Sequence, residues 1–270
     1  MHTHSTFSDG TCTPSEVVRL AAEAGLEAVA LTDHDTVAGL PEARQAGKRY
    51  GIRVVNGIEI SVKAAVSVHM VGLGFPDDAA LVEEAMRDIV SARAERNARV
   101  IERLQTLGYP ITEEDVNQYA HGVPGRSHIA RAMYEKGLIR SIKEAFATLL
   151  NRGMPAYVPR RELTPQEAIE LIHRQGGRIF VAHLNQIRLP DDEKYEFLRA
   201  LKDDGLDGIE GYYTEYTPEM GTRYREWAEK LGLRLSGGSD FHGANKEGHL
   251  VGVGDGDLRV PSALLAQILT

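Results

Sequence analysis

Short apolar runs of strand length alternate along this chain with segments of helical period, and most of these runs end on a histidine or an acidic residue. The run 28–32 leads into Asp33 and His34, and the run 178–182 ends on His183. Apolar strands that alternate with helices are typical of a parallel sheet, and this many repeats favour a closed barrel. Because barrel proteins build their sites at the carboxyl ends of the strands, the polar residues that end the runs are candidate site residues.

Local signals delimit the helices between these runs. Residues 13–16 (Thr-Pro-Ser-Glu) have the spacing of a capping box with proline in the first turn, and Gly25 ends the helix that follows. Further helices are predicted over about 38–50, 165–175, 193–204 and 218–231. The repeated strand–helix units predict an α/β fold.

Residues 77–160 break the alternation. This stretch has no convincing strand, and its pattern predicts helices over about 78–107, 112–119, 127–136 and 142–152. We therefore predict a barrel domain from residues 1–76 and 161–270 and an inserted small helical domain from residues 77–160. Because the insertion follows the run that carries His69, we expect it to cap the site.

Nine histidines and carboxylates near the ends of the apolar runs form a candidate metal-binding set: His2, His4, Asp9, His34, Glu59, His69, His183, Asp240 and His242. Residues two apart in a strand point to the same side, so His2 and His4 can bind one ion, as can Asp240 and His242. Glu59 lies between two isoleucines, where an uncompensated carboxylate would be costly. A single strand histidine is more often a hydrogen-bonded core residue, but nine polar residues in equivalent positions favour a metal site.

The composition excludes several function classes. With 31 Lys and Arg against 39 Asp and Glu, the formal net charge is −8, which argues against a surface for long duplex nucleic acid. Cys12 is the only cysteine, so no disulfide framework is expected. No apolar run approaches the roughly 18 residues of a membrane span, and no signal sequence precedes the histidines. A cytoplasmic protein without membrane contacts is the expectation.

Several runs resemble the motifs of the PHP family (polymerase and histidinol phosphatase). The matching runs are residues 2–10 (HTHSTFSDG), 32–35 (TDHD), 57–59 (GIE), 182–183 (AH) and 238–242 (GSDFH). Two runs in the insertion, 125–130 (GRSHIA) and 155–159 (PAYVP), are similar to those of stand-alone PHP phosphoesterases, especially the 3′,5′-nucleotide bisphosphate phosphatase type. Relatives usually have several residues before the His-x-His pair. Here only Met1 precedes it, so either the chain starts late or its first strand is abbreviated.

The resemblance implies a distorted seven-stranded (β/α) barrel with a trinuclear metal site. All nine positions would divide among three ions: the first takes His2, His4, Glu59 and Asp240, the second shares Glu59 and adds His69 and His183, and the third takes Asp9, His34 and His242. The mixed nitrogen and oxygen donors permit three divalent ions of Mn, Fe or Zn. Asp33 and Asp35 are expected to support ligand histidines rather than to bind metal.

The implied reaction is hydrolysis of a small phosphate ester, in which a metal-bridging hydroxide attacks phosphorus. The favoured substrate is a nucleotide, through removal of the 3′-phosphate of a 3′,5′-bisphosphate nucleoside. A cyclic ribose phosphate diester, the 5′ end of short RNA and histidinol phosphate are alternative substrates. From other classes, a metal-dependent amidohydrolase and a non-catalytic PHP scaffold are weaker alternatives.

Cationic residues in or beside the insertion are candidates for binding a second phosphate: Arg126, His128, Arg160 and Arg161. Planar guanidinium groups bind phosphate in a bidentate manner, although an exposed arginine is also commonly a solvated surface charge. A second basic run, Arg93, Arg96, Arg99 and Arg103, is interleaved with glutamates. This pattern is more typical of a solvated helix face.

Overall fold

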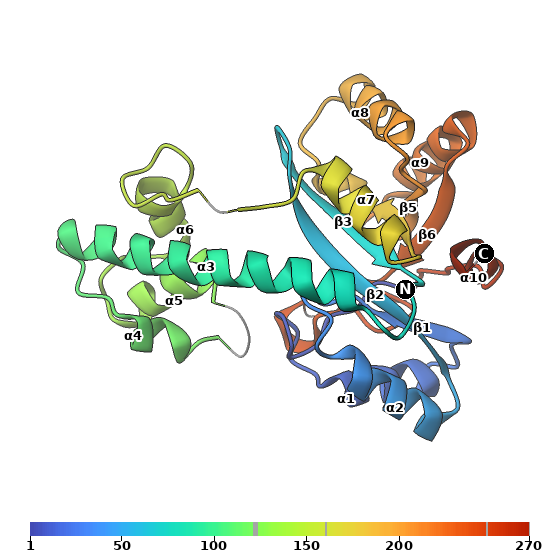
Figure 1. The fold of residues 1–270 in the computed structure, drawn as a ribbon, viewed down its shortest axis with the longest axis horizontal. Coiled ribbons are helices and arrows are strands. Elements are labelled where there is room, and N and C mark those ends of the chain that lie inside the picture. The colour runs from blue at the N-terminus through green and yellow to red at the C-terminus, as the bar shows by residue number, and fades with distance from the viewer. Residues whose placement is uncertain (121–123, 160, 247, 270) are drawn as a thin grey trace. The chain divides into compact units, whose positions relative to one another are not determined.

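The computed structural model describes residues 1–120, 124–159, 161–246 and 248–269 of the 270-residue chain. The chain divides into two compact units (Figure 1). The first unit combines Met1–Glu84 with Glu162–Thr270, and the second unit is Ala85–Arg161. Since helix α3 (Ala80–Thr106) begins in the first unit and continues into the second, each unit is described by itself.

The first unit is built on a curled sheet whose strands follow one another in chain order. The strands are β1 (Ala28–Leu31), β2 (Arg53–Lys63), β3 (Ser67–Leu73), β4 (Arg178–Val181), β5 (Gly208–Tyr213) and β6 (Arg234–Gly238). Three neighbouring pairs are parallel, whereas β3 runs antiparallel to both β2 and β4. Only residues 64–66 connect β2 to β3, and such a short connection cannot make the crossover that a parallel pair needs. The sheet is therefore mixed rather than wholly parallel.

Helices accompany the strands as the alternation predicted. They are α1 (Pro14–Glu23), α2 (Leu40–Tyr50), α7 (Pro165–Arg174), α8 (Asp191–Asp203), α9 (Pro218–Leu231) and α10 (Leu264–Leu269). The capping box of α1 is confirmed, because the Thr13 side chain accepts from the backbone of Glu16 while the Glu16 carboxylate accepts from Thr13. Figure 1 shows α1 and α2 side by side next to β1, in agreement with their contacts.

Residues 1–4 join the ends of the first and last strands. The carbonyl of Thr3 accepts from the amide of Thr32, 2.9 Å away, just beyond β1. The amide of His4 donates to the carbonyl of Phe241 over 2.8 Å, just beyond β6. Gly238 permits this approach, since a Cβ there would lie 2.4 Å from the Cβ of His2. The sheet of the described residues has six strands, so the expected seventh strand is not confirmed; the first residues contribute a single bridge instead.

The second unit is helical in its described residues. Besides most of α3, it contains α4 (Glu113–Asn117), α5 (Arg126–Glu135), α6 (Ile142–Ala145) and the π-helical turn η1 (Phe146–Leu150). Its core includes Leu104, Ile129 and Met133, which are fully buried. The basic run of α3 was predicted to be solvated. This prediction is wrong for Arg96, which is only 3% exposed. Within the described residues, no helix is both long and apolar enough to cross a membrane.

Candidate metal centre

The nine candidate ligands meet in one cluster of the first unit, at the end of the sheet where β1, β4 and β6 finish. Donor atoms lie within 4.8 Å of one another in three groups: His4, Asp9, His34 and His242; His2, His4, Glu59 and Asp240; and His34, Glu59 and His69. The ninth residue, His183, joins them through its Nε2, which lies 2.8 Å from the Glu59 carboxylate. Glu59 and His69 lie inside β2 and β3, which pair with each other, so the strand register brings together residues that are far apart in the sequence.

The Glu59 carboxylate lies at the centre of the cluster and is 1% exposed. Its Oε1 lies 2.9 Å from Nδ1 of His69 and 2.8 Å from Nε2 of His183. Its Oε2 faces three other imidazoles: His2 at 3.1 Å, His4 at 3.0 Å and His34 at 3.2 Å. A carboxylate with donors around both oxygens can bridge two cations.

The pattern of unsatisfied atoms fits bound ions. Five buried atoms of the cluster make no hydrogen bond to any described residue: His2 Nε2, His4 Nε2, His34 Nδ1, Glu59 Oε2 and Asp240 Oδ1. Buried polar atoms are rarely left unsatisfied. Yet the closest pairs among these five atoms are only 3.0–3.5 Å apart. The atoms therefore lie close together, but their geometry is not that of hydrogen bonds. Ligands that share one ion at about 2.1 Å lie roughly 3.0–3.4 Å apart, and the donor set therefore fits divalent cations.

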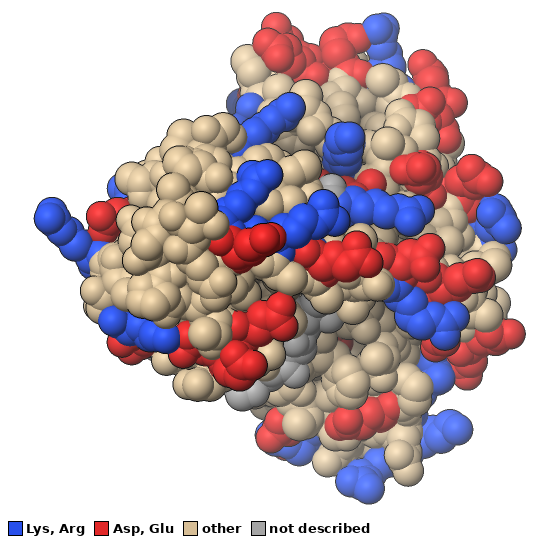
Figure 2. All heavy atoms as spheres, turned by 60° about the vertical axis from the view of Figure 1, so that its left-hand side comes forward, with Lys and Arg blue, Asp and Glu red and all other residues tan. Residues whose placement is uncertain are grey.

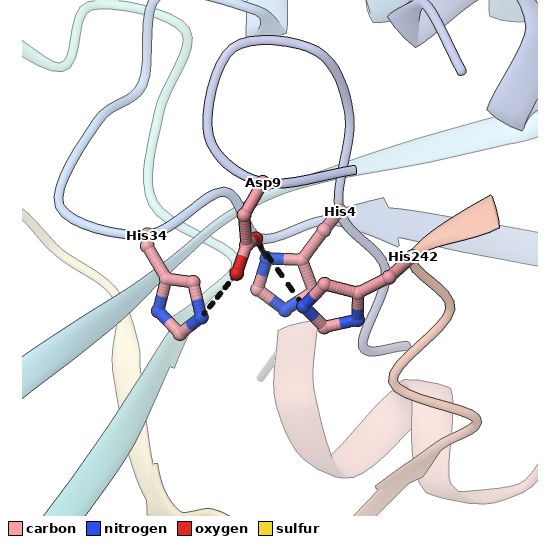
Figure 3. Close-up of side chains that lie close together, drawn as sticks. All are labelled: His4, Asp9, His34 and His242. Atoms are coloured by element: carbon pink, nitrogen blue, oxygen red, sulfur yellow. Dashed lines mark ion pairs between the residues drawn. The ribbon is translucent and has the colours of Figure 1, made fainter. Parts of the chain in front are cut away.

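Asp9 reaches the cluster from the loop after the His-x-His pair, as Figure 3 shows. Its Oδ1 lies 3.2 Å from Nε2 of His242 and 3.6 Å from Nδ1 of His4. Its Oδ2 lies 3.7 Å from Nε2 of His34. One carboxylate thus faces three imidazoles from three different segments of the chain, an arrangement that suits a further cation.

Burial and mutual charge set the protonation of the cluster. Burial opposes the charged form of His4, but the carboxylates of Asp240 and Glu59 raise its pKa to about 9. Burial lowers the pKa of His34 to about 4, although Glu59 acts in the other direction. Burial also disfavours the ionised carboxylate of Glu59, yet the surrounding imidazoles hold its pKa well below its usual value. The carboxylates are therefore charged near pH 7 and attract cations.

Asp33 and Asp35 support the backbone around the cluster. Asp33 accepts from the amide and the hydroxyl of Ser5, both at 2.7 Å, and from the hydroxyl of Ser8. Asp35 accepts from the amide of Ser61 at 3.1 Å. Asp33 thus holds the turn between His4 and Asp9, and the Ser8 hydroxyl from which it accepts lies 3.5 Å from Nδ1 of His4.

Glu210 in β5 contacts two of the candidate ligands, although the sequence did not predict it as a site residue. Its Oε2 accepts from the amide of His183 over 2.8 Å, and its Oε1 lies 3.1 Å from Nδ1 of His2. The next amide, that of Leu184, donates to the hydroxyl of Tyr216 at 2.8 Å. These contacts hold His183 in an uncommon backbone conformation, with φ 27° and ψ 66°. Its position as a carboxylate beside the apolar Ile209 in a short strand was the signal that could have revealed it.

Asp240 also has neighbours that the sequence did not suggest. The hydroxyl of Tyr213 donates to its Oδ2 over 3.0 Å, and Nζ of Lys246 lies 2.5 Å from the same oxygen. Asp240 has a positive φ of 51°, a conformation that these contacts help to maintain. Oδ2 is thereby fixed, while Oδ1 faces the imidazoles.

The predicted substrate-binding residues lie in the second unit. Arg126 donates from Nη1 to the carbonyl of Leu150 over 3.1 Å, and its guanidinium lies 5.7 Å from the centre of the Tyr157 ring. Nδ1 of His128 accepts from the amide of Gly125 at 3.0 Å. Arg161 lies 3.9 Å from the Asp88 carboxylate, and Arg160 is outside the described residues. The contacts described here are all within this unit.

Comparison with known proteins gives consistent matches over most of the chain. The model of the PHP domain matches residues 1–219. A 5′-3′ exoribonuclease from Haemophilus influenzae is 32% identical over 243 residues, which cover 90% of this chain and 89% of the relative. A 3′,5′-nucleoside bisphosphate phosphatase from Chromobacterium violaceum is 30% identical over 255 residues, 93% of this chain and 90% of the relative. A crystal structure described as a metal-dependent phosphoesterase, from Bifidobacterium adolescentis, is 33% identical with a TM-score of 0.81, over 99% of this chain and 94% of that one.

Proposed function

Because this chain belongs to the PHP family of metal-dependent phosphoesterases, we propose that it removes the 3′-phosphate from a 3′,5′-bisphosphate nucleoside. The convergence of nine histidines and carboxylates on one buried cluster carries the proposal, since such a donor set suits several divalent ions. The choice of substrate is supported by the bisphosphate phosphatase relative, which aligns with 93% of this chain.

We propose that three divalent ions of Mn, Fe or Zn bind to this cluster. The first would be held by His2, His4, Glu59 and Asp240, the second by Glu59, His69 and His183, and the third by Asp9, His34 and His242. Ions bound there would supply positive charge that lowers the pKa of a water molecule and neutralises the phosphate of the substrate.

Residues around the cluster would position the reactants. Burial and the neighbouring Asp240 carboxylate raise the pKa of Tyr213, so this phenol stays protonated and keeps Asp240 oriented. Lys246 contacts Asp240, and its side chain is 29% exposed. Its ammonium group is therefore suited to orient a phosphate that enters from solvent.

The surface charge argues against long duplex nucleic acid as the substrate. On the face shown in Figure 2, lysine and arginine side chains are interspersed with aspartate and glutamate. A protein that binds long duplex nucleic acid usually gathers its basic residues into a patch or stripe instead. We propose that Arg126, His128, Arg160 and Arg161 contact the substrate, and that they lie in or beside an inserted domain of residues 77–160 that caps the site. A guanidinium has five N–H donors, so the bond from Arg126 to Leu150 does not by itself prevent a phosphate contact.

The finer description of the fold is also a proposal. We propose that residues 1–4 take the place of the first strand of a distorted seven-stranded barrel. The hydrogen bonds of Thr3 and His4 to the residues beyond β1 and β6 support it, since they link the two edges of the sheet.

A phosphate-release screen of the Mn-loaded protein tests the proposed function. Adenosine 3′,5′-bisphosphate should be hydrolysed faster than adenosine 3′- or 5′-monophosphate, a cyclic ribose phosphate or histidinol phosphate. The Glu59→Gln variant, purified in the same way, should release no phosphate, and a mock preparation from cells without the protein measures contaminating phosphatases. Faster hydrolysis of any of the other compounds would contradict the proposed substrate. Phosphate release by the variant above the mock preparation, at the rate of the wild type, would refute the proposed site.

Hydrolysis of short RNA from its 5′ end is a second candidate. The observation that favours it is the exoribonuclease relative, which is 32% identical over 90% of this chain. A short RNA labelled at its 3′ end separates the two candidates. An exoribonuclease would shorten it stepwise from the 5′ end, whereas a phosphatase specific for bisphosphate nucleosides would leave its length unchanged.

A further inference from the structure

A cavity of about 640 Å³ opens beside the candidate metal centre in the first unit. His69 and His183, which belong to the metal cluster, line it together with Ser67 at the start of β3. Asn185, Gln186 and Arg188, which follow closely after His183 in the sequence, also line it. A cavity of this size is within the range of small-molecule sites, so a ligand in it would lie against two proposed ligands of the ions.

The segment after His183 is anchored so that its polar side chains reach the cavity. Leu184 and Ile187 are buried in the core, whereas the residues between them line the cavity. The amide group of Asn185 donates to Glu215 over 3.1 Å, and that of Gln186 donates to the hydroxyl of Tyr213 over 3.1 Å. Tyr213 in turn donates to Asp240, which links the cavity wall to the metal cluster. The wall is thus held in place before any ligand binds.

Arg188 differs from the other exposed arginines nearby in the chain. Arg174 lies 3.8 Å from Glu170, and Arg199 and Arg223 each pair with a carboxylate. Arg188 makes no hydrogen bond or ion pair to any residue that the structure describes, and it lines the cavity with its neighbours. A guanidinium without a carboxylate partner, next to a preformed cavity, is suited to bind a phosphate in a bidentate manner.

We propose that this cavity binds the nucleoside part of the substrate and that Arg188 binds its second phosphate, the one that is not hydrolysed. The amide groups of Asn185 and Gln186 would then lie beside the sugar and its hydroxyl groups. This subsite rests on the proposed function, because it assumes that the scissile phosphate binds at the metal centre. It makes Arg188 a specificity residue for nucleotides with two phosphates.

Kinetics of the Arg188→Ala variant with two substrates tests this subsite. For adenosine 3′,5′-bisphosphate we expect kcat/KM to fall about 10- to 100-fold, as for the loss of a charge-assisted hydrogen bond. For adenosine 3′-monophosphate, which lacks the second phosphate, it should change by less than about threefold. Arg188→Lys should restore part of the loss, and Arg174→Ala is the matched control that should behave as wild type. An equal loss on both substrates, or no loss on the bisphosphate, would overturn the subsite.

A binding measurement separates failure of the subsite from failure of the proposed function. Calorimetry with adenosine 5′-monophosphate, the expected product, should show weaker binding to Arg188→Ala than to the wild type, with adenosine bound equally by both. If the wild type releases no phosphate but this difference in binding is found, the proposed function fails and the subsite stands. If phosphate is released and the two proteins bind the product equally, only the subsite fails.

Discussion

The Glu210 carboxylate holds the backbone of His183 rather than the His183 imidazole. Its Oε2 accepts a hydrogen bond from the His183 amide over 2.8 Å. Its other oxygen lies 3.1 Å from Nδ1 of His2. One buried carboxylate therefore sets the direction of two candidate ligands that are 181 positions apart in the sequence. It also fixes the tautomer of His2, because Nδ1 must carry the proton for Nε2 to bind an ion.

Replacing Glu210 by glutamine should weaken metal binding while the protein stays folded. The glutamine oxygen can accept from the His183 amide, but its NH₂ group would then face Nδ1 of His2 and favour the tautomer in which Nε2 is protonated. Loss of such a supporting contact typically costs about 10- to 100-fold in metal affinity. Metal content after dialysis, measured by mass spectrometry, checks this. Glu226→Gln, on the exposed face of α9, is the control and should retain all of its metal.

Glu59→Gln should abolish turnover and lower the number of bound ions. The carboxylate is the only group of the nine that approaches five imidazoles, and the amide has the same size without the charge. His183→Ala should have the same effect on turnover. The control is Glu229→Gln, which removes an exposed carboxylate and should change neither turnover nor the number of bound ions. Full activity in either Glu59→Gln or His183→Ala would refute the metal centre.

Metal binding should release protons, and metal affinity should rise with pH. In the metal-free protein the carboxylates of Asp240 and Glu59 overcome the effect of burial and raise the pKa of His4 to about 9, so its imidazole is protonated at pH 7 and must lose that proton to bind an ion. Below pH 9, this one proton makes affinity increase about tenfold per pH unit. His34, with a pKa lowered to about 4, contributes no proton in that range. Calorimetry of Mn binding at pH 7 and 8, in buffers of different ionisation heat, measures the effect. Equal affinity at both values contradicts it.

The sequence predicted the cluster because several of its ligands obey a local rule. His34, His183 and Asp240 follow the apolar strands β1, β4 and β6, whose carboxyl ends lie at one end of the sheet. Glu59 and His69 lie inside β2 and the antiparallel β3, so the rule does not by itself account for them. The antiparallel direction of β3 was missed because it depends on a short connection rather than on the strand residues themselves. Glu210 was not predicted as a site residue, since its role depends on a contact with a backbone amide 27 positions away.

Burial in the second unit could not be predicted by the same reasoning. The charge pattern of Arg93, Arg96, Arg99 and Arg103 is that of an exposed helix face, and Arg99 is indeed 63% exposed beside Glu95. Arg96 is nevertheless only 3% exposed, and a pattern within one helix does not reveal such burial. The same limit applies to Arg126, whose bond to Leu150 joins segments 24 positions apart.

Replacing Arg126 by alanine tests whether this arginine contacts the substrate. If Arg126 contacts substrate as proposed, Arg126→Ala should raise KM for adenosine 3′,5′-bisphosphate several-fold and leave kcat nearly unchanged, because it removes binding that is equal in the ground and transition states. Steady-state kinetics of the variant and the wild type measure both constants.

Stability must be measured beside these kinetics, because Arg126 also has a contact inside its own unit. Loss of its hydrogen bond to the Leu150 carbonyl should cost about 0.5–1.5 kcal/mol of unfolding free energy. A fall in thermal midpoint with an unchanged KM would make Arg126 a structural residue and leave Arg188 to bind the second phosphate. A raised KM for the bisphosphate with an unchanged KM for the monophosphate would instead place Arg126 at the substrate, since lost stability alone affects both compounds equally.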